Sequence, residues 1–321
     1  MQTLIKNTRA YKLLKAETAK NRLAHAYLVL LDDSRNLRAA LKTFAKILFG
    51  GDEPLSPAQK RIADLIEAES FSDCLFFPAP DKKFMVEDAE KIAEESALKA
   101  VEGEKKVFVV GDFAEATIAA QNKLLKLLEE PPQGVVFLLG ATTAFPVLST
   151  VLSRVEKLEI PPFSVEEISA CLTRFEGGRY ATNDIQLASA ACGGSLGAAQ
   201  NALEGGGYKT VLDDALSLCL AAESALPALV RKIGETKNKK QLLSMLRIVF
   251  RDALLIKTGV AGILLQSERG RLGAIAKRFT TRALLYAQEA LTKAEREVFF
   301  NAVFPQCLET LMAGVIKENQ L

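Results

Sequence analysis

The sequence predicts an α/β protein, in which a parallel sheet with helices on both faces occupies the first half and helices alone occupy the second. Short apolar runs alternate with amphipathic segments as far as residue 160, whereas apolar residues recur only at helical spacing after residue 163. Parallel strands need crossover connections, so this alternation indicates right-handed units of strand, helix and strand. Pro161-Pro162 separates the two patterns.

The most informative stretch combines a helix, a strand and the loop that follows them. Leucines at helical spacing over residues 124–128 predict a helix, which ends at about Glu130 because two prolines follow it. The apolar, glycine-flanked run at residues 135–139 predicts a buried strand of the parallel sheet. This strand delivers Thr142 and Thr143 to its carboxyl end, the edge at which open α/β sheets bind ligands.

Two acidic residues stand at the predicted helix end. Glu129 and Glu130 place negative charge where the helix dipole is also negative, an arrangement that costs about 0.3–1 kcal/mol for each charge. Such broken local rules often mark functional positions. The alternative is that both carboxylates are simply solvated.

The motifs in this stretch resemble those of a known family. N-K-L-L-K-L-L-E-E-P-P at residues 122–132, A-T-T at 141–143 and S-R at 153–154 are together similar to bacterial clamp-loader subunits of the AAA+ class. R-L-A-H-A-Y-L at residues 22–28 and G-G-S at 193–195 extend the resemblance over roughly the first two-thirds of the chain.

The resemblance implies a division into three domains. Residues 1–162 would form a P-loop-type AAA+ parallel-sheet domain with a degenerate P-loop, and residues 163–207 a small helical lid. Residues 208–321 would form an all-helical collar through which subunits assemble. Three glycines at 205–207 predict a flexible connector between lid and collar.

The phosphate-binding loop of an ATPase is missing. A P-loop requires G-x-x-x-x-G-K-[ST], because glycine backbone N–H groups and a lysine hold the phosphates. Alignment on the family places Leu31, Asn36, Leu37 and Arg38 at the four defining positions. Asp32 and Asp33 add negative charge that would repel a phosphate.

Other elements of an ATPase or metal site are also replaced. The resemblance puts Gly111 where ATP-hydrolysing relatives have a metal-organising aspartate, with only Asp112 beside it, and puts Gly197 where they have a lid arginine. Some relatives carry a four-cysteine zinc module, but only Cys74 lies in the corresponding region. We therefore expect no bound cofactor, no metal and no catalytic centre of the chain's own. The alternatives are an active AAA+ ATPase with a diverged P-loop and a stand-alone interaction scaffold on the same fold.

One candidate site residue remains, Arg154, with Ser153 as its supporting motif. The resemblance implies that this arginine acts in trans, reaching across a subunit interface to the γ-phosphate of a neighbouring subunit's ATP. A permanently charged, planar guanidinium suits that role because it can bind phosphoryl oxygens bidentately. The alternative is a structural ion pair with a nearby carboxylate such as Glu156.

Composition and family together indicate the setting of the protein. The formal charge of +2, from 41 basic and 39 acidic residues, does not indicate a general polyanion binder, so any nucleic-acid contact must be local. Five scattered cysteines without a C-x-x-C pair, no apolar run of membrane-span length and no signal-peptide core predict a cytoplasmic protein. The resemblance implies a hetero-pentamer with clamp-loader ATPase subunits and a delta subunit, which acts indirectly on the sliding clamp and holds primer-template DNA.

Overall fold

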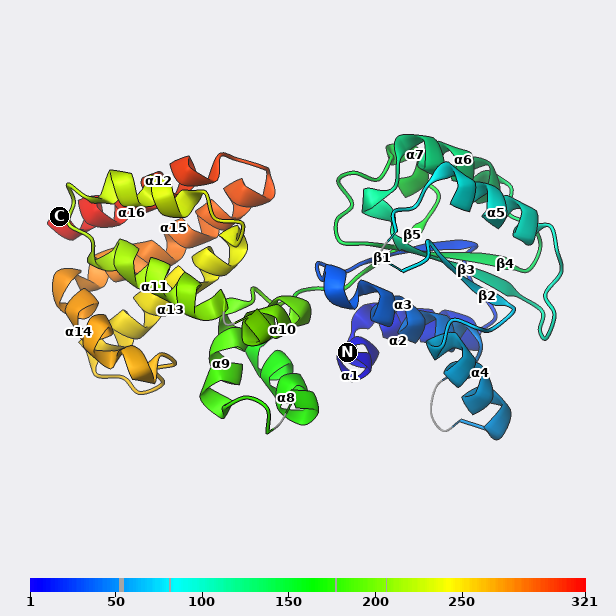
Figure 1. Cartoon of the computed structure of the whole chain (residues 1–321), viewed down its shortest axis with the longest axis horizontal. Coiled ribbons are helices and arrows are strands. Elements are labelled where there is room, and N and C mark those ends of the chain that lie inside the picture. Colours follow the sequence, from blue (N-terminus) through cyan, green and yellow to red (C-terminus); the bar gives the residue numbers. More distant parts are fainter. Residues whose placement is uncertain (52–54, 81, 177, 206) are drawn as a thin grey trace. The chain divides into compact units, whose positions relative to one another are not determined.

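The computed structural model describes residues 1–51, 55–80, 82–176, 178–205 and 207–321, and separates into two compact units (Figure 1). The first unit comprises residues 1–162 and the second residues 163–321. The α/β class predicted from the sequence is confirmed, because strands occur with helices in the first unit and helices build the second.

The first unit is built on a parallel sheet of five strands in the order β2-β3-β4-β1-β5. The strands are β1 Ala26–Leu30, β2 Cys74–Phe77, β3 Lys106–Asp112, β4 Val135–Ala141 and β5 Glu156–Glu159. Every residue of β4 is buried, as the uninterrupted apolar run predicted. Since all strands run in the same direction, their carboxyl ends meet at one edge of the sheet.

Helices cover both faces of this sheet (Figure 1). One face carries α1 Gln2–Asn7, α2 Arg9–Ala19, α3 Ser34–Leu48 and α4 Pro57–Glu67, and the other carries α5 Val86–Ser96, α6 Ile118–Glu129 and α7 Ser149–Leu152. Leu124 and Leu128 of α6 pack with Phe108 and Phe137 of the sheet in one apolar cluster. The short 3-10 helix η1, Phe113–Glu115, follows β3.

The second unit is a group of helices around α13. Its elements are α8 Val165–Glu176, α9 Thr182–Ala191, α10 Leu196–Gly205, α11 Gly207–Leu220, α12 Leu226–Gly234, α13 Lys239–Thr258, η2 Gln266–Glu268, α14 Arg269–Arg278, α15 Thr281–Phe299 and α16 Phe304–Gln320. The apolar side of α13 is buried within a cluster that reaches from Leu187 in α9 to Val315 in α16. Within the described ranges, no helix is both long and apolar enough to cross a membrane.

The glycine-rich stretch between the predicted lid and collar is largely helical. Gly205 is the last residue of α10 and Gly207 the first of α11, whereas Gly206 lies outside the described residues. One apolar cluster includes residues on both sides of these glycines. The separation of residues 163–207 from residues 208–321 therefore stays a prediction.

Candidate functional site

The amino terminus of α3 lies where a P-loop would bind phosphate. The turn between β1 and α3 contains Asp33, which is 3% exposed and caps the helix. Its carboxylate accepts a hydrogen bond from the Asn36 backbone N–H at 3.1 Å and another from the Asn36 side-chain amide at 2.9 Å. Helix amino termini bind anions through free N–H groups. Here one of these groups is already bound to the chain's own anion.

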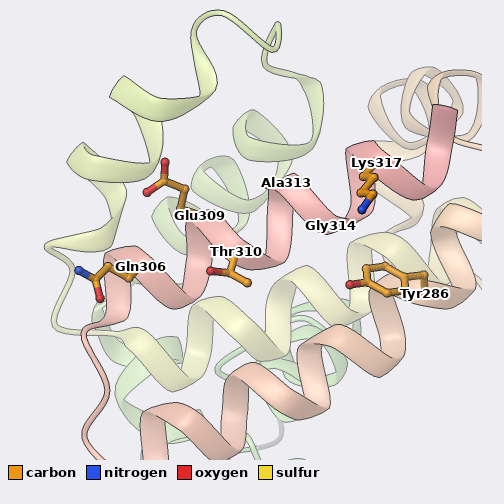
Figure 2. Close-up of a pocket in the computed structure, with 7 residues that line it drawn as sticks. All are labelled: Tyr286, Gln306, Glu309, Thr310, Ala313, Gly314 and Lys317. Carbon is orange, nitrogen blue, oxygen red and sulfur yellow. The ribbon is translucent and has the colours of Figure 1, made fainter.

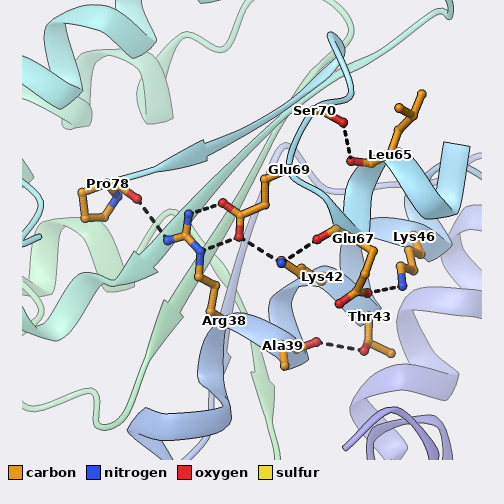
Figure 3. Close-up of polar contacts among 10 residues, drawn as sticks. All are labelled: Arg38, Ala39, Lys42, Thr43, Lys46, Leu65, Glu67, Glu69, Ser70 and Pro78. Atoms are coloured by element: carbon orange, nitrogen blue, oxygen red, sulfur yellow. Dashed lines mark hydrogen bonds and ion pairs between the residues drawn. The ribbon is translucent and has the colours of Figure 1, made fainter. Parts of the chain in front are cut away.

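Arg38, which the resemblance aligns with the P-loop serine or threonine, is held by a polar network (Figure 3). Its Nε donates to Glu69 Oε1 at 2.6 Å, its Nη2 donates to Glu69 Oε2, and its Nη1 donates to the Pro78 carbonyl at 3.0 Å. Lys42 Nζ forms a second ion pair with Glu69 at 3.0 Å. The hydrogen bonds from Arg38, with a further contribution from Lys42, lower the pKa of Glu69 from its ordinary value. The network ties α3 to the segments on both sides of β2.

Two hydrophobic residues near the start of α3, Leu31 and Leu37, are part of the core. Leu31 is 4% exposed and Leu37 is 2% exposed, so neither side chain faces a solvent-filled phosphate site. An aliphatic side chain also has no charge to offer to a phosphate. Leu37, which the resemblance aligns with the P-loop lysine, is therefore a packing residue.

Gly111 lies beside Arg38. A Cβ at Gly111 would lie 3.9 Å from Arg38 Nη1 and 3.5 Å from the Phe77 carbonyl oxygen. A carboxylate at this position would therefore meet a guanidinium that is already paired. In the part of the chain that the structure describes, no group of three or more His, Cys, Asp or Glu side chains is arranged to hold a metal ion.

Asp112 joins the carboxyl ends of β3 and β4. Its carboxylate accepts hydrogen bonds from the Thr142 N–H at 3.3 Å, the Thr142 Oγ1 at 3.2 Å and the Ala114 N–H at 3.2 Å. Burial raises the pKa of Asp112, although these hydrogen bonds oppose that shift. Asp112 thus has a structural role at the edge where sequence reasoning placed Thr142 and Thr143.

Arg154 follows α7 and forms an ion pair with Glu129, the last residue of α6. Arg154 Nη2 lies 2.8 Å from Glu129 Oε1. Its Nη1 donates to the Thr150 carbonyl at 2.8 Å and to Ser153 Oγ at 3.1 Å. The side chains of Arg154 and Glu129 are 34% and 49% exposed. The structure thus brings together the predicted pair Ser153 and Arg154, with a carboxylate that sequence reasoning had not assigned to them.

The alternative partner Glu156 has a different environment. Burial raises the pKa of Glu156, and the nearby Glu17 raises it further. The partner of Arg154 is instead one of the two acids that break the helix-end rule. The sequence showed that Glu129 is an acid at the wrong end of a helix, but it did not show that Arg154 is the residue that pairs with it.

Gln121 is a positioning residue that sequence reasoning missed. It is fully buried, and its Oε1 accepts a hydrogen bond from the Leu148 N–H at 2.9 Å. Its Nε2 donates to the Pro146 carbonyl at 3.2 Å and to the Ala116 carbonyl at 3.3 Å. Gln121 therefore fixes the loop that leads from β4 to α7 and hence to Arg154. The sequence feature that could have indicated this role is the polar Gln121 in the first turn of α6, on a helix face that is otherwise apolar.

The second unit carries an open groove of about 670 Å³ along α15 and α16 (Figure 2). Glu309 and Lys317 stand on its α16 side, next to the small residues Ala313 and Gly314. A Cβ at Gly314 would lie 2.7 Å from the hydroxyl oxygen of Tyr286, so glycine permits the close approach of the two helices.

Comparison with known proteins identifies the family. Residues 6–164 match the family model described as DNA polymerase III, delta subunit. The delta' subunit of DNA polymerase III from Bacillus subtilis (strain 168) is 30% identical over 50% of this chain and 49% of its own length. The tau subunit of the same organism is 24% identical over 89% of this chain and 56% of its own length. The chain thus spans about half the length of these curated relatives.

Solved structures of similar proteins also match over most of the chain. A gamma subunit-related protein of DNA polymerase III from Thermotoga maritima aligns with 95% of this chain and 99% of its own, at 17% identity and a TM-score of 0.43. The clamp loader delta protein of Bacillus subtilis aligns over the same shares, at 11% identity and a TM-score of 0.34.

The five-stranded parallel sheet with helices on both faces defines an α/β protein. Within that class, the chain belongs to the family of DNA polymerase III clamp-loader subunits.

Proposed function

We propose that the chain is a delta-prime type subunit of the clamp loader, which binds no nucleotide of its own and supplies Arg154 to the ATP of a neighbouring subunit. One observation carries this proposal: two arginines of the first unit are held differently. Arg38 contacts both carboxylate oxygens of Glu69 and the Pro78 carbonyl, whereas the contact of Arg154 with an acid, among the residues that the structure describes, is to one carboxylate oxygen of Glu129.

The closed phosphate region argues against hydrolysis by this chain. Catalysis of phosphoryl transfer depends almost entirely on positioning and on electrostatic stabilisation by backbone N–H groups, a lysine and a metal ion. Asp33 occupies the helix amino terminus, Leu37 replaces the lysine, and Gly111 replaces the metal-organising acid. Each change removes a favourable contact with phosphate, and Asp33 adds repulsion.

The surroundings of Arg154 support a role toward an external anion. Two of its contacts are to neutral oxygens, of Thr150 and Ser153, and among the described residues it is the Glu129 contact that neutralises its charge. An exposed ion pair of this kind is weak and readily exchanged. A phosphoryl group offers several charged oxygens and so can replace the single carboxylate oxygen.

The assembly that this role requires is carried over from the family. We propose a cytoplasmic hetero-pentamer of this chain with clamp-loader ATPase subunits and a delta subunit, joined through the helical residues 208–321 as a collar. The complex would place the sliding clamp on primer-template DNA, with this chain acting on the clamp indirectly. Residues 163–207 would form the lid.

Substitution of Arg154 tests the proposed role. We expect Arg154→Ala to leave assembly intact and to lower the DNA- and clamp-stimulated ATP hydrolysis of the reconstituted complex by about tenfold or more. Arg154→Lys should lower hydrolysis almost as much, because lysine lacks the planar guanidinium. Arginines that a partner protein supplies in trans increase the rate of hydrolysis by on the order of 10³–10⁵, and this range is the upper limit for the effect of Arg154. Arg61→Ala is the matched control, since Arg61 also forms an exposed pair with a glutamate of the same unit. Unchanged hydrolysis by an assembled Arg154→Ala complex would refute the role.

The alternative of an active ATPase predicts a different result for the isolated chain. Because Asp33 and Arg38 already occupy the phosphate region, we expect calorimetric titration with Mg-ATP or Mg-ADP to show no binding in the micromolar range. A micromolar dissociation constant would revive the ATPase interpretation. The same titration of a partner ATPase subunit is the positive control.

A further inference from the structure

We infer that Glu129 is a positioning residue that holds Arg154 in a stand-by position until the nucleotide of a neighbouring subunit replaces its carboxylate. The inference rests on the proposed function of Arg154 and adds a role for the first acid of the E-E-P-P motif. It is carried by the ion pair between Arg154 Nη2 and Glu129 Oε1 at 2.8 Å.

The helix end explains why this carboxylate needs a cation. Glu129 is the last residue of α6 and Glu130 is its carboxyl-terminal cap, so both acids lie at the negative end of the helix dipole. Lys126 is the basic residue in the last turn of α6. The guanidinium that comes from the end of α7 offsets the repulsion at Glu129. The acid that breaks the local rule thus has a partner that is distant in sequence.

The contacts divide the guanidinium into a fixed end and an exchangeable end. Nη1 is anchored on the segment of α7 itself, through the Thr150 carbonyl and Ser153 Oγ. Ser153 Oγ in turn donates to the Thr150 carbonyl at 3.0 Å, which orients the serine. Nη2 contacts Glu129. An arriving phosphoryl oxygen can therefore take the place of Glu129 while Nη1 keeps its anchor.

Exposure makes the exchange feasible. Glu129 is 49% exposed and Arg154 is 34% exposed, so water screens their attraction. A phosphoryl group carries more negative charge than a carboxylate and can contact the guanidinium bidentately. The carboxylate thus orients the arginine in the free subunit and competes only weakly with a correctly placed phosphoryl group.

Two neutralising substitutions at adjacent positions test the inference. Glu129→Gln removes the carboxylate that contacts Arg154, whereas Glu130→Gln removes the same charge from the same helix end. In the isolated full-length chain, phenylglyoxal should modify Arg154 about two to five times faster in Glu129→Gln than in the natural protein, as mass spectrometry of the Arg154 peptide would measure. Glu130→Gln should leave this rate unchanged.

Hydrolysis by the reconstituted complex gives the second readout. In the absence of clamp and DNA, Glu129→Gln should raise ATP hydrolysis about two- to fivefold, and Glu130→Gln should not. The double variant with Arg154→Ala should behave like Arg154→Ala alone, because Glu129 acts only through Arg154.

The outcomes separate the inference from the proposed function. If Glu129→Gln and Glu130→Gln match each other in Arg154 modification and in hydrolysis, the stand-by position is overturned, even where Arg154→Ala abolishes hydrolysis. If Arg154→Ala leaves hydrolysis unchanged, the proposed function fails, even where Glu129→Gln accelerates the modification of Arg154.

Discussion

Two arginine–glutamate pairs in the same unit hold their arginines with different strength. Arg38 donates from three nitrogens, to both carboxylate oxygens of Glu69 and to the Pro78 carbonyl, and the paired side chains are 27% and 20% exposed. Arg154 contacts one carboxylate oxygen of Glu129, and these side chains are 34% and 49% exposed. Bidentate, partly desolvated pairs resist exchange, whereas exposed single contacts do not.

The difference shows that residue type alone does not reveal the role of a charged side chain. We propose that both arginines occupy positions that correspond to nucleotide-handling motifs in the family. The surroundings of Arg38 turn it into a structural tie between α3 and the ends of β2. The surroundings of Arg154 leave its side chain 34% exposed and paired through one carboxylate oxygen.

Arg38→Ala should have the largest effect on stability. The substitution leaves the Glu69 carboxylate with Lys42 as its remaining ion-pair partner and deprives the Pro78 carbonyl of a donor. We expect the free energy of unfolding to fall by about 1.5–3 kcal/mol, the range for lost hydrogen bonds to charged groups. Denaturant titration followed by circular dichroism measures the change, and hydrogen exchange should locate it in α3 and α4.

Arg61→Ala is the control for this prediction. Arg61 pairs with Glu102 at 2.9 Å, and its side chain is 55% exposed. Loss of such a pair should change the free energy of unfolding by less than about 1 kcal/mol. Equal effects of Arg38→Ala and Arg61→Ala would mean that the Arg38 network is no stronger than a surface pair.

Glu69→Gln should have a smaller effect that depends on pH. Arg38 chiefly, and Lys42 in addition, lower the pKa of Glu69 below its ordinary value of 4.5. A lowered pKa stabilises the fold at pH values above the unfolded-state pKa of about 4.3, and this stabilisation is lost as the pH falls through the folded-state pKa. The difference in unfolding free energy between the natural protein and Glu69→Gln should therefore be larger at about pH 7 than at about pH 3.5.

Urea titrations at both pH values measure that difference. Glu67→Gln serves as the control, since Glu67 pairs with Lys46 at the edge of the same network but its side chain is 52% exposed. A difference for Glu69→Gln that grows toward acid pH would contradict the sign of the assigned shift.

The fold could be predicted from local patterns because those patterns report burial. The apolar run at β4 and the proline pair after α6 depend on a few consecutive residues, and the structure places both elements where they were expected. The helix predicted to end at about Glu130 has Glu130 as its cap. These elements can be predicted from neighbouring residues, without knowing which residues far apart in the sequence are in contact.

The partners in the candidate site could not be predicted in this way. Glu69 contacts Arg38 because the segment after α4 lies next to α3. Glu129 contacts Arg154 because α6 and α7 pack together. Proximity in sequence favoured Glu156, which lies in β5 near Glu17 instead. A sequence shows that a charge is misplaced, whereas the tertiary structure shows which residue compensates it.

The smallest effect on stability should be that of Glu129→Gln. Losing an exposed ion pair costs about 0.2–1 kcal/mol, but removing an acid from a helix carboxyl terminus recovers about 0.3–1 kcal/mol. The two contributions oppose each other, so the free energy of unfolding should change by no more than about 0.5 kcal/mol. Glu130→Gln recovers the helix-end penalty without losing a contact to Arg154, so it should be neutral or slightly stabilising in the same denaturant titration. A destabilisation by Glu129→Gln as large as that by Glu69→Gln would show that both arginines are structural ties, and the contrast between the two pairs would then no longer hold.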